Sequence, residues 1–324
     1  MTPYRIDVHY HLQPPRYSAN ERVRASTTRN ASGLGWSPEF IKKNIIDAFA
    51  YTVAVEQLDR RGIATAIASV GATGIWFGDV ALGRRLAREW NEDATRLSQD
   101  YPGRFGVFAT IPLPDTEGSL KEIEYALDTL KADGICIITS YDDKWLGDPS
   151  FVPVFEELNC RKAVVFVHPT APLCCANLDA NAPSFLLEVP TDTARTITSL
   201  IFSGAAARFP DIRFIFSHAG GTIMPVAGRL TDLVQPATNL VDKIPHGFAA
   251  ELQKFYYDTA GAADHAAMNA LRAVVSNAHI LFGSDYPFVP EQTVLRVGKL
   301  GLPADDLRAI ERGNAQSLLP RWRA

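Results

Sequence analysis

Several signals are scarce or absent in this sequence of 324 residues, and each absence excludes a class of protein. The four cysteines form no CxxC pair, which argues against a zinc ribbon or a disulfide framework. The 32 lysines and arginines are balanced by 36 aspartates and glutamates without charged blocks, so neither nucleic acid nor a membrane is an expected partner. A leader-like pattern and any run of about 18 apolar residues are also missing, which favours a cytoplasmic protein.

Nucleotide-binding signatures are absent as well, because no strand-like segment is followed by a GxGxxG or P-loop motif. Linkers, internal repeats and low-complexity tracts are missing too. With 47% hydrophobic residues, the chain is long enough to bury one large core. We therefore expect a single barrel domain over residues 1–324, in which the polar stretch 13–44 forms a loop or small subdomain over the barrel mouth.

What the sequence does contain is a series of short apolar runs that predict eight strands. They span residues 4–11, 63–70, 105–113, 134–141, 163–169, 213–220, 255–260 and 280–287. Most are near-continuously apolar, as parallel strands buried on both faces are. Amphipathic helical patterns occur at residues 79–101, 120–131, 151–162, 192–209 and 263–277. This alternation predicts an α/β fold, a (β/α)8 TIM barrel, with a doubly wound sheet as the alternative.

Histidines and an aspartate stand at the ends of four predicted strands. His9 and His11 are two residues apart on the first strand, so both side chains project from the same side, into the barrel. His168 ends the fifth strand, His218 the sixth and Asp285 the eighth. Three imidazoles and one carboxylate at the active end of a barrel suit one divalent ion, Zn first and Mn second, with a position left for water or substrate. His218 then remains to move protons.

With these residues in place, the sequence resembles the amidohydrolase superfamily and, within it, the branch that contains 6-methylsalicylate decarboxylase and aminocarboxymuconate-semialdehyde decarboxylase. The motifs DVHYHL, VVFVHPT, FIFSHAGG and ILFGSDYPF follow one another in the order of that branch, and the likeness covers nearly the whole chain. The resemblance implies that His9, His11, His168 and Asp285 are metal ligands. It also implies that His218 is the acid–base group.

The resemblance extends to substrate-binding positions. Arg229 matches an arginine that binds a substrate carboxylate across a dimer interface, which implies a homodimer; a salt bridge within its own helix is the alternative. The second carboxylate-binding arginine of the family is missing, because Ala54 and Glu56 stand near its place. This departure favours a simple aromatic carboxylic acid over a doubly acidic substrate.

Aromatic residues near the strand ends predict an apolar cavity for a planar ring. Phe185 and Phe288 are expected to contact the substrate, since the family resemblance supports both positions. Trp76 and Phe77, which follow the second strand, are further candidates.

Two reactions remain open from the sequence. The first is non-oxidative decarboxylation of a hydroxybenzoate such as 6-methylsalicylate, with Asp285 or His218 supplying the proton. The alternative is hydrolysis of a lactone, ester or amide by a mononuclear metal enzyme. In the superfamily that this sequence resembles, hydrolases with two metals bridge them through a carboxylated lysine at the end of the fourth strand. Here Lys144 lies beyond the core of that strand among acids, as a solvated loop residue does, so a second metal is not expected. A metal-storing or scaffold barrel is the non-enzymatic alternative.

Overall fold

The computed structural model describes residues 3–32, 37–175, 181–234 and 238–323. Over these residues, eight parallel strands form one sheet in the order β1-β2-β3-β4-β7-β8-β9-β10. They are β1 (Arg5–His11), β2 (Ile63–Ser69), β3 (Phe105–Thr110), β4 (Gly134–Ile138), β7 (Val164–His168), β8 (Arg213–Phe216), β9 (Tyr256–Asp258) and β10 (Ile280–Leu281). Each predicted strand region contains one of them.

The two ends of this sheet meet and close it into a barrel. Beyond β10 the chain runs alongside β1, where the amide of Val8 donates to the carbonyl of Phe282 at 3.0 Å. The amide of Asp285 donates to the carbonyl of His9 at 2.8 Å. An open doubly wound sheet would leave these edges unpaired, so the closure confirms the predicted (β/α)8 barrel.

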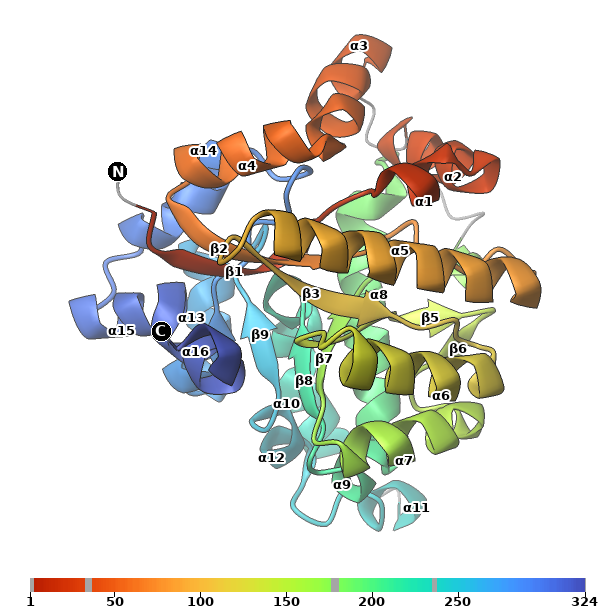
Figure 1. Ribbon diagram of the computed structural model, residues 1–324. Coiled ribbons are helices and arrows are strands. Elements are labelled where there is room, and N and C mark those ends of the chain that lie inside the picture. The colour runs from red at the N-terminus through yellow and green to blue at the C-terminus, as the bar shows by residue number, and fades with distance from the viewer. Residues whose placement is uncertain (1–2, 33–36, 176–180, 235–237, 324) are drawn as a thin grey trace.

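Helices surround the strands, and α5, α6 and α7 lie side by side on one side of the barrel (Figure 1). The longer helices are α2 (Glu21–Ser32), α4 (Tyr51–Arg60), α5 (Val80–Asp100), α6 (Thr116–Glu124), α7 (Val152–Cys160), α8 (Ser184–Phe202), α10 (Ile223–Leu233) and α13 (His265–Val274). The shorter ones are α1 (Pro15–Ala19), α3 (Pro38–Ile41), α9 (Ala205–Arg208), α11 (Thr238–Val241), α12 (Phe248–Leu252), α14 (Glu291–Val294), α15 (Ala304–Arg308) and α16 (Asn314–Leu318). None of the helices in the described ranges combines the length and apolarity needed to cross a membrane.

The segment 13–44 contains helices α1, α2 and α3, while its residues 33–36 lie outside the described residues. Two contacts attach α1 to the barrel. The hydroxyl of Tyr17 donates to the carbonyl of Gly74, which follows β2, at 2.5 Å. The guanidinium of Arg16 donates to the carboxylate of Asp93 on α5. Helix α1 is therefore fixed near the ends of the strands that carry the candidate site.

Helix α8 begins at Ser184, eight residues before the predicted start of this helical segment at residue 192. Pro190 lies inside this helix and has no amide hydrogen to donate. Two hydrogen bonds outside the helical ladder lie beside this proline: the hydroxyl of Thr191 donates to the carbonyl of Leu187, and the amide of Thr222 donates to the carbonyl of Pro190. The helix continues through Pro190 to Phe202.

The predicted fourth strand ends at Ile138, earlier than expected. The chain then forms a small antiparallel hairpin from β5 (Ser140–Tyr141) and β6 (Lys144–Trp145). Asp142 and Asp143 both have positive φ angles, as the two central residues of a type I′ turn do. Lys144 is exposed on this hairpin, in agreement with its interpretation as a solvated residue.

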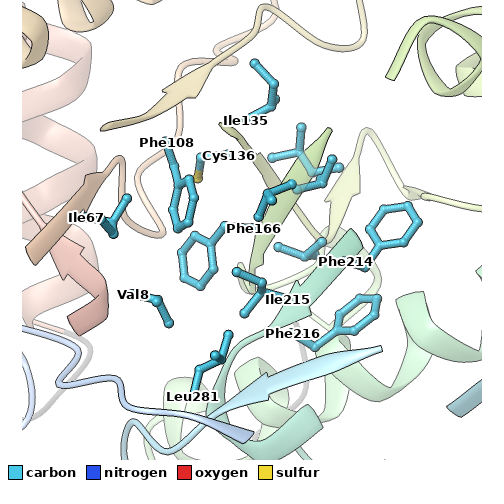
Figure 2. Close-up of a cluster of buried hydrophobic side chains, with 14 of the residues drawn as sticks. Val8, Ile67, Phe108, Ile135, Cys136, Phe166, Phe214, Ile215, Phe216 and Leu281 are labelled. Atoms are coloured by element: carbon cyan, nitrogen blue, oxygen red, sulfur yellow. The ribbon is translucent and has the colours of Figure 1, made fainter. Parts of the chain in front are cut away.

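Large apolar side chains form the buried core on both faces of the strands (Figure 2). The rings of Phe108 and Phe166 stack with their centroids 5.7 Å apart. The ring of Phe166 also meets the imidazole of His9 edge to face at 5.0 Å. These phenylalanines form an apolar floor beneath the histidines of β1 and keep water away from that side of the candidate site.

Candidate metal centre

Four of the predicted side chains converge at the carboxyl ends of the strands. His9 and His11 come from β1, His168 from the end of β7, and Asp285 from the segment after β10. All four are buried, and each offers one ligand atom within 4.8 Å of the others. The Nε2 atoms of His9 and His11 are 3.0 Å apart, and Oδ1 of Asp285 lies 3.3 Å and 3.2 Å from them.

The other ring nitrogens of these histidines face hydrogen-bond acceptors. Nδ1–H of His9 donates to Oδ2 of Asp258 at 2.8 Å. Nδ1–H of His168 donates to the carbonyl of Pro169 at 2.8 Å. When Nδ1 carries the hydrogen, Nε2 presents a lone pair to the centre, which is the arrangement that metal-ligating histidines use.

Asp258 is a candidate functional residue that the sequence interpretation did not single out. It stands at the end of β9, fully buried, and its Oδ1 accepts the backbone amide of His218 at 3.0 Å. The signal in the sequence that could have identified Asp258 is its position as a single acidic residue at the end of an apolar strand. Gly283 lies close by, where a Cβ would come within 2.9 Å of the Cβ of His9 and 3.0 Å of that of Asp258. Glycine is therefore needed for this close approach.

The electrostatics of the group fit a divalent cation. Burial would lower the pKa of His9, but the charges of Asp258 and Asp285 outweigh it and raise this pKa to about 10. Burial, with the neighbouring His11 and His9, holds the pKa of His168 well below its usual value. Burial alone would raise the pKa of Asp285, but the charge of His9 and hydrogen bonds from histidines hold it far below the usual range.

Asp285 is therefore ionised, and its Oδ1 has no hydrogen-bond partner within the described part of the chain. A divalent cation at the centre would give this buried carboxylate oxygen a partner. Three imidazole nitrogens and one carboxylate match the donors that Zn and related divalent ions prefer. The residues present thus fit a single metal ion.

His218 lies beside this group without belonging to it. Its Nε2 is 3.2 Å from Oδ2 of Asp285, while its Nδ1 has no hydrogen-bond partner in the described ranges. His218 and Asp285 have φ angles of 55° and 52°, in the left-handed region that costs a non-glycine residue about 1–2 kcal/mol. Packing and hydrogen bonds, including that from the His218 amide to Asp258, must therefore hold both side chains in place.

A cavity of about 310 Å³ opens onto His11, His168, His218 and Asp285. Phe185 and Phe288, which the sequence analysis expects to contact the substrate, both line it. Phe49, which the sequence interpretation missed, lines it too, with its ring centroid 6.3 Å from that of Phe288.

The prediction for Trp76 and Phe77 was wrong. They line a neighbouring hollow and do not line the metal-facing cavity. The metal-facing cavity therefore takes its aromatic rings from other segments.

Arg229 does not line the cavity of its own chain. It lies exposed on α10, and within the described residues it forms no hydrogen bond or ion pair, so the alternative of a salt bridge in its helix finds no acid partner. The vicinal Cys174 and Cys175 are free thiols whose sulfurs lie 3.3 Å apart.

A closed parallel barrel with three histidines and an aspartate gathered at the carboxyl ends of its strands defines a class of metal-dependent barrel enzymes. The model of the family described as "Amidohydrolase" matches residues 6–321. The chain belongs to the amidohydrolase family, which confirms the resemblance drawn from its motifs.

Its relatives include named decarboxylases. The chain is 34% identical to decarboxylase macB of Penicillium terrestre, over 98% of this chain and 96% of that protein. It is 31% identical to the 6-methylsalicylic acid decarboxylase of Penicillium expansum, with the same coverage of both chains. Among solved structures, a dihydroxybenzoic acid decarboxylase from Polaromonas sp. JS666, with bound manganese and 2-nitroresorcinol, has the same fold; the TM-score is 0.84, the identity 20%, and the coverage 100% of this chain and 98% of that one.

Proposed function

We propose that this protein is a carboxy-lyase, a metal-dependent non-oxidative decarboxylase of a hydroxybenzoate-type aromatic acid such as 6-methylsalicylate. The observation that carries the proposal is the aromatic-lined, largely apolar cavity that opens directly onto Asp285 and His218. A cavity of this kind suits a small planar ring. The relatedness to a 6-methylsalicylic acid decarboxylase over nearly the full length of both chains supports it.

We propose that His9, His11, His168 and Asp285 hold one divalent ion. Zn suits the three-imidazole, one-carboxylate donor set, and the manganese of the Polaromonas structure makes Mn the alternative. When bound, the ion supplies Lewis-acid polarisation of the substrate carboxylate and its ortho hydroxyl. The protein contributes the fixed donor geometry, with Asp258 and the carbonyl of Pro169 orienting the imidazoles.

The proton transfer is assigned to the pair formed by His218 and Asp285. Asp285 is held ionised by its neighbours and orients the ring of His218 through the 3.2 Å contact, so we assign the role of proton donor to His218. The proton adds to the ring carbon that bears the carboxylate. The bond to the carboxylate then breaks, its electron pair returns to the ring, and CO2 and a phenol are the products. The apolar lining from Phe185 and Phe288 keeps competing water away from the ring.

We also propose a homodimer in which Arg229 enters the cavity of the neighbouring chain and binds the substrate carboxylate. Its exposure and the lack of an acid partner among the described residues support this role. On the same helix, Val226 and Leu233 are 39% and 59% exposed, and Leu186 and Leu187 are exposed on the adjoining α8. Exposed apolar side chains on adjoining helices are typical of an interaction surface.

We also propose that residues 1–324 form a single domain and that the protein is cytoplasmic.

The competing reaction is hydrolysis of a lactone, ester or amide. It would use the same five polar side chains, those of His9, His11, His168, His218 and Asp285. The test is to incubate the metal-loaded protein with a panel of hydroxybenzoates and a panel of aryl esters and lactones. Release of CO2 with the matching phenol supports the proposal. Release of a carboxylic acid from the second panel, without CO2 from the first, overturns it.

A further inference from the structure

The lining of the metal-facing cavity has two polar regions. The first consists of the metal group with His218. The second consists of Gln13, Thr27 and Thr73, and every remaining lining residue is apolar or glycine. This second region lies outside the metal chemistry, so its presence in an otherwise apolar cavity requires a separate explanation.

The three side chains form a connected chain of hydrogen bonds. Nε2 of Gln13 donates to Oγ1 of Thr27 at 3.0 Å, and the hydroxyls of Thr27 and Thr73 lie 3.3 Å apart. They come from three segments, namely the end of β1, helix α2 and the turn after β2. Thr27 is only 6% exposed, which makes this a built feature of the cavity wall rather than a chance surface contact.

This polar trio lies on the β1–β2 side of the metal group. Gln13 follows His11 by two residues, and Thr73 follows Gly71, where a Cβ would come within 3.3 Å of the His11 ring. A ring bound at the metal group therefore has the trio at one edge, while the other walls of the cavity are apolar.

The trio has unused hydrogen-bonding capacity. Gln13 uses one of its two amide hydrogens, and its Oε1 has no partner in the described ranges. Among the residues that the structure describes, the hydroxyl of Thr73 bonds to that of Thr27 alone. A ring that fills the cavity removes water from these groups, and desolvated polar groups without partners oppose binding. The best ligand therefore supplies a partner of its own.

That partner is neutral. Within the described residues of the chain itself, no lysine or arginine lines the cavity, and the Arg229 proposed to enter from the neighbouring chain is assigned to the carboxylate held at the metal group. A second carboxylate beside the trio would therefore lose its hydration without gaining a cation. A hydroxyl donates and accepts at once, which matches an amide oxygen and a threonine hydroxyl.

We propose that Gln13, Thr27 and Thr73 bind a second ring hydroxyl, distinct from the one ortho to the carboxylate, so that the preferred substrate is a dihydroxybenzoate with a single carboxylate. This inference rests on the proposed decarboxylase function and deepens it. It makes the trio the part of the cavity that selects among hydroxybenzoates.

The test compares 6-methylsalicylate with its analogues that carry one further ring hydroxyl at each free position in turn. We expect kcat/KM to be roughly 10- to 100-fold higher for at least one analogue, the scale of one or two matched hydrogen bonds. Thr73→Val, which keeps the side-chain shape, and Gln13→Leu should each bring the ratio of kcat/KM for that analogue to kcat/KM for 6-methylsalicylate close to one. Thr28→Val is the matched control, because Thr28 is the next residue on α2, is exposed and does not line this cavity; it should keep the ratio.

A binding experiment separates this inference from the proposed function. The Kd values of the same acids for the metal-loaded protein are measured by calorimetry, which needs no turnover. Suppose that no acid is decarboxylated, but that the native protein binds one hydroxylated analogue more tightly than 6-methylsalicylate and Thr73→Val does not. The proposed reaction then fails and the hydroxyl site stands. Equal Kd values for all analogues, or a ratio that survives in both Thr73→Val and Gln13→Leu, would overturn the hydroxyl site.

Discussion

The carboxylate of Asp258 lies 2.8 Å from Nδ1 of His9, with both side chains completely buried. This contact turns Nε2 of His9 toward the centre of the candidate metal site. The other oxygen of the same carboxylate accepts the backbone amide of His218. One acid at the end of β9 therefore positions both a proposed ligand and the proposed proton donor.

Asp258→Asn should weaken metal binding by about 10- to 100-fold, since it keeps the shape of the side chain and removes the charge that fixes the His9 tautomer. Competition with a chelator of known affinity measures the effect. Asp264→Asn is the matched control, because Asp264 caps helix α13 away from the cavity and asparagine is also a good N-cap. Unchanged metal affinity in Asp258→Asn would show that this contact serves only the fold.

Metal binding should release about one proton per ion near neutral pH. The pKa of His9 is raised to about 10, so the metal-free site holds a proton there that the ion must displace, whereas His11 and His168, with lowered pKa values, hold none. The apparent affinity should therefore rise with pH by about tenfold per unit and level off near the pKa of His9. Calorimetry in buffers of different ionisation enthalpy counts the proton. A pH-independent affinity between pH 7 and 9 would contradict this protonation state.

His218→Ala should keep its metal and lose activity by roughly 100- to 10,000-fold, the usual contribution of a positioned acid–base group. The expectation follows from its place 3.2 Å from Asp285 but outside the four converging ligands. Elemental analysis and turnover are measured on the same sample. Loss of the metal in this variant would make His218 a ligand instead.

Much of the site could be predicted because its residues end apolar strands. Once a barrel is inferred, the carboxyl ends of its strands share one rim, so His9, His168 and Asp285 must approach one another. The HxH spacing adds a second imidazole on the same face. The local sequence was therefore enough to predict both the barrel fold and the proposed ligand set.

Other features depend on contacts between distant segments, which local patterns do not encode. Asp258 gains its role only from lying beside His9, and Gln13 and Thr27 only from the packing of α2 over the cavity. Helix α8 continues through Pro190, whose carbonyl accepts the amide of Thr222 from a distant segment. Tertiary packing therefore overrode the usual rule that proline ends a helix.

Arg229 provides a test of assembly. Mixing inactive His218→Ala chains with inactive Arg229→Ala chains should restore activity, because some heterodimers regain one cavity with both groups intact. A mixture of His218→Ala with Asp285→Ala is the control and should stay inactive, since both changes affect the centre of their own chain. If the first mixture recovers no activity after verified subunit exchange, Arg229 does not act in the neighbouring cavity.

The central claim, decarboxylation at the metal group, is tested most directly by incubating the metal-loaded protein with 6-methylsalicylate and its hydroxylated analogues in D2O. The account predicts one CO2 for each phenol formed, with deuterium on the ring carbon that carried the carboxylate. A metal-replete protein that releases no CO2 from any of these acids, yet hydrolyses an ester or lactone, would contradict it.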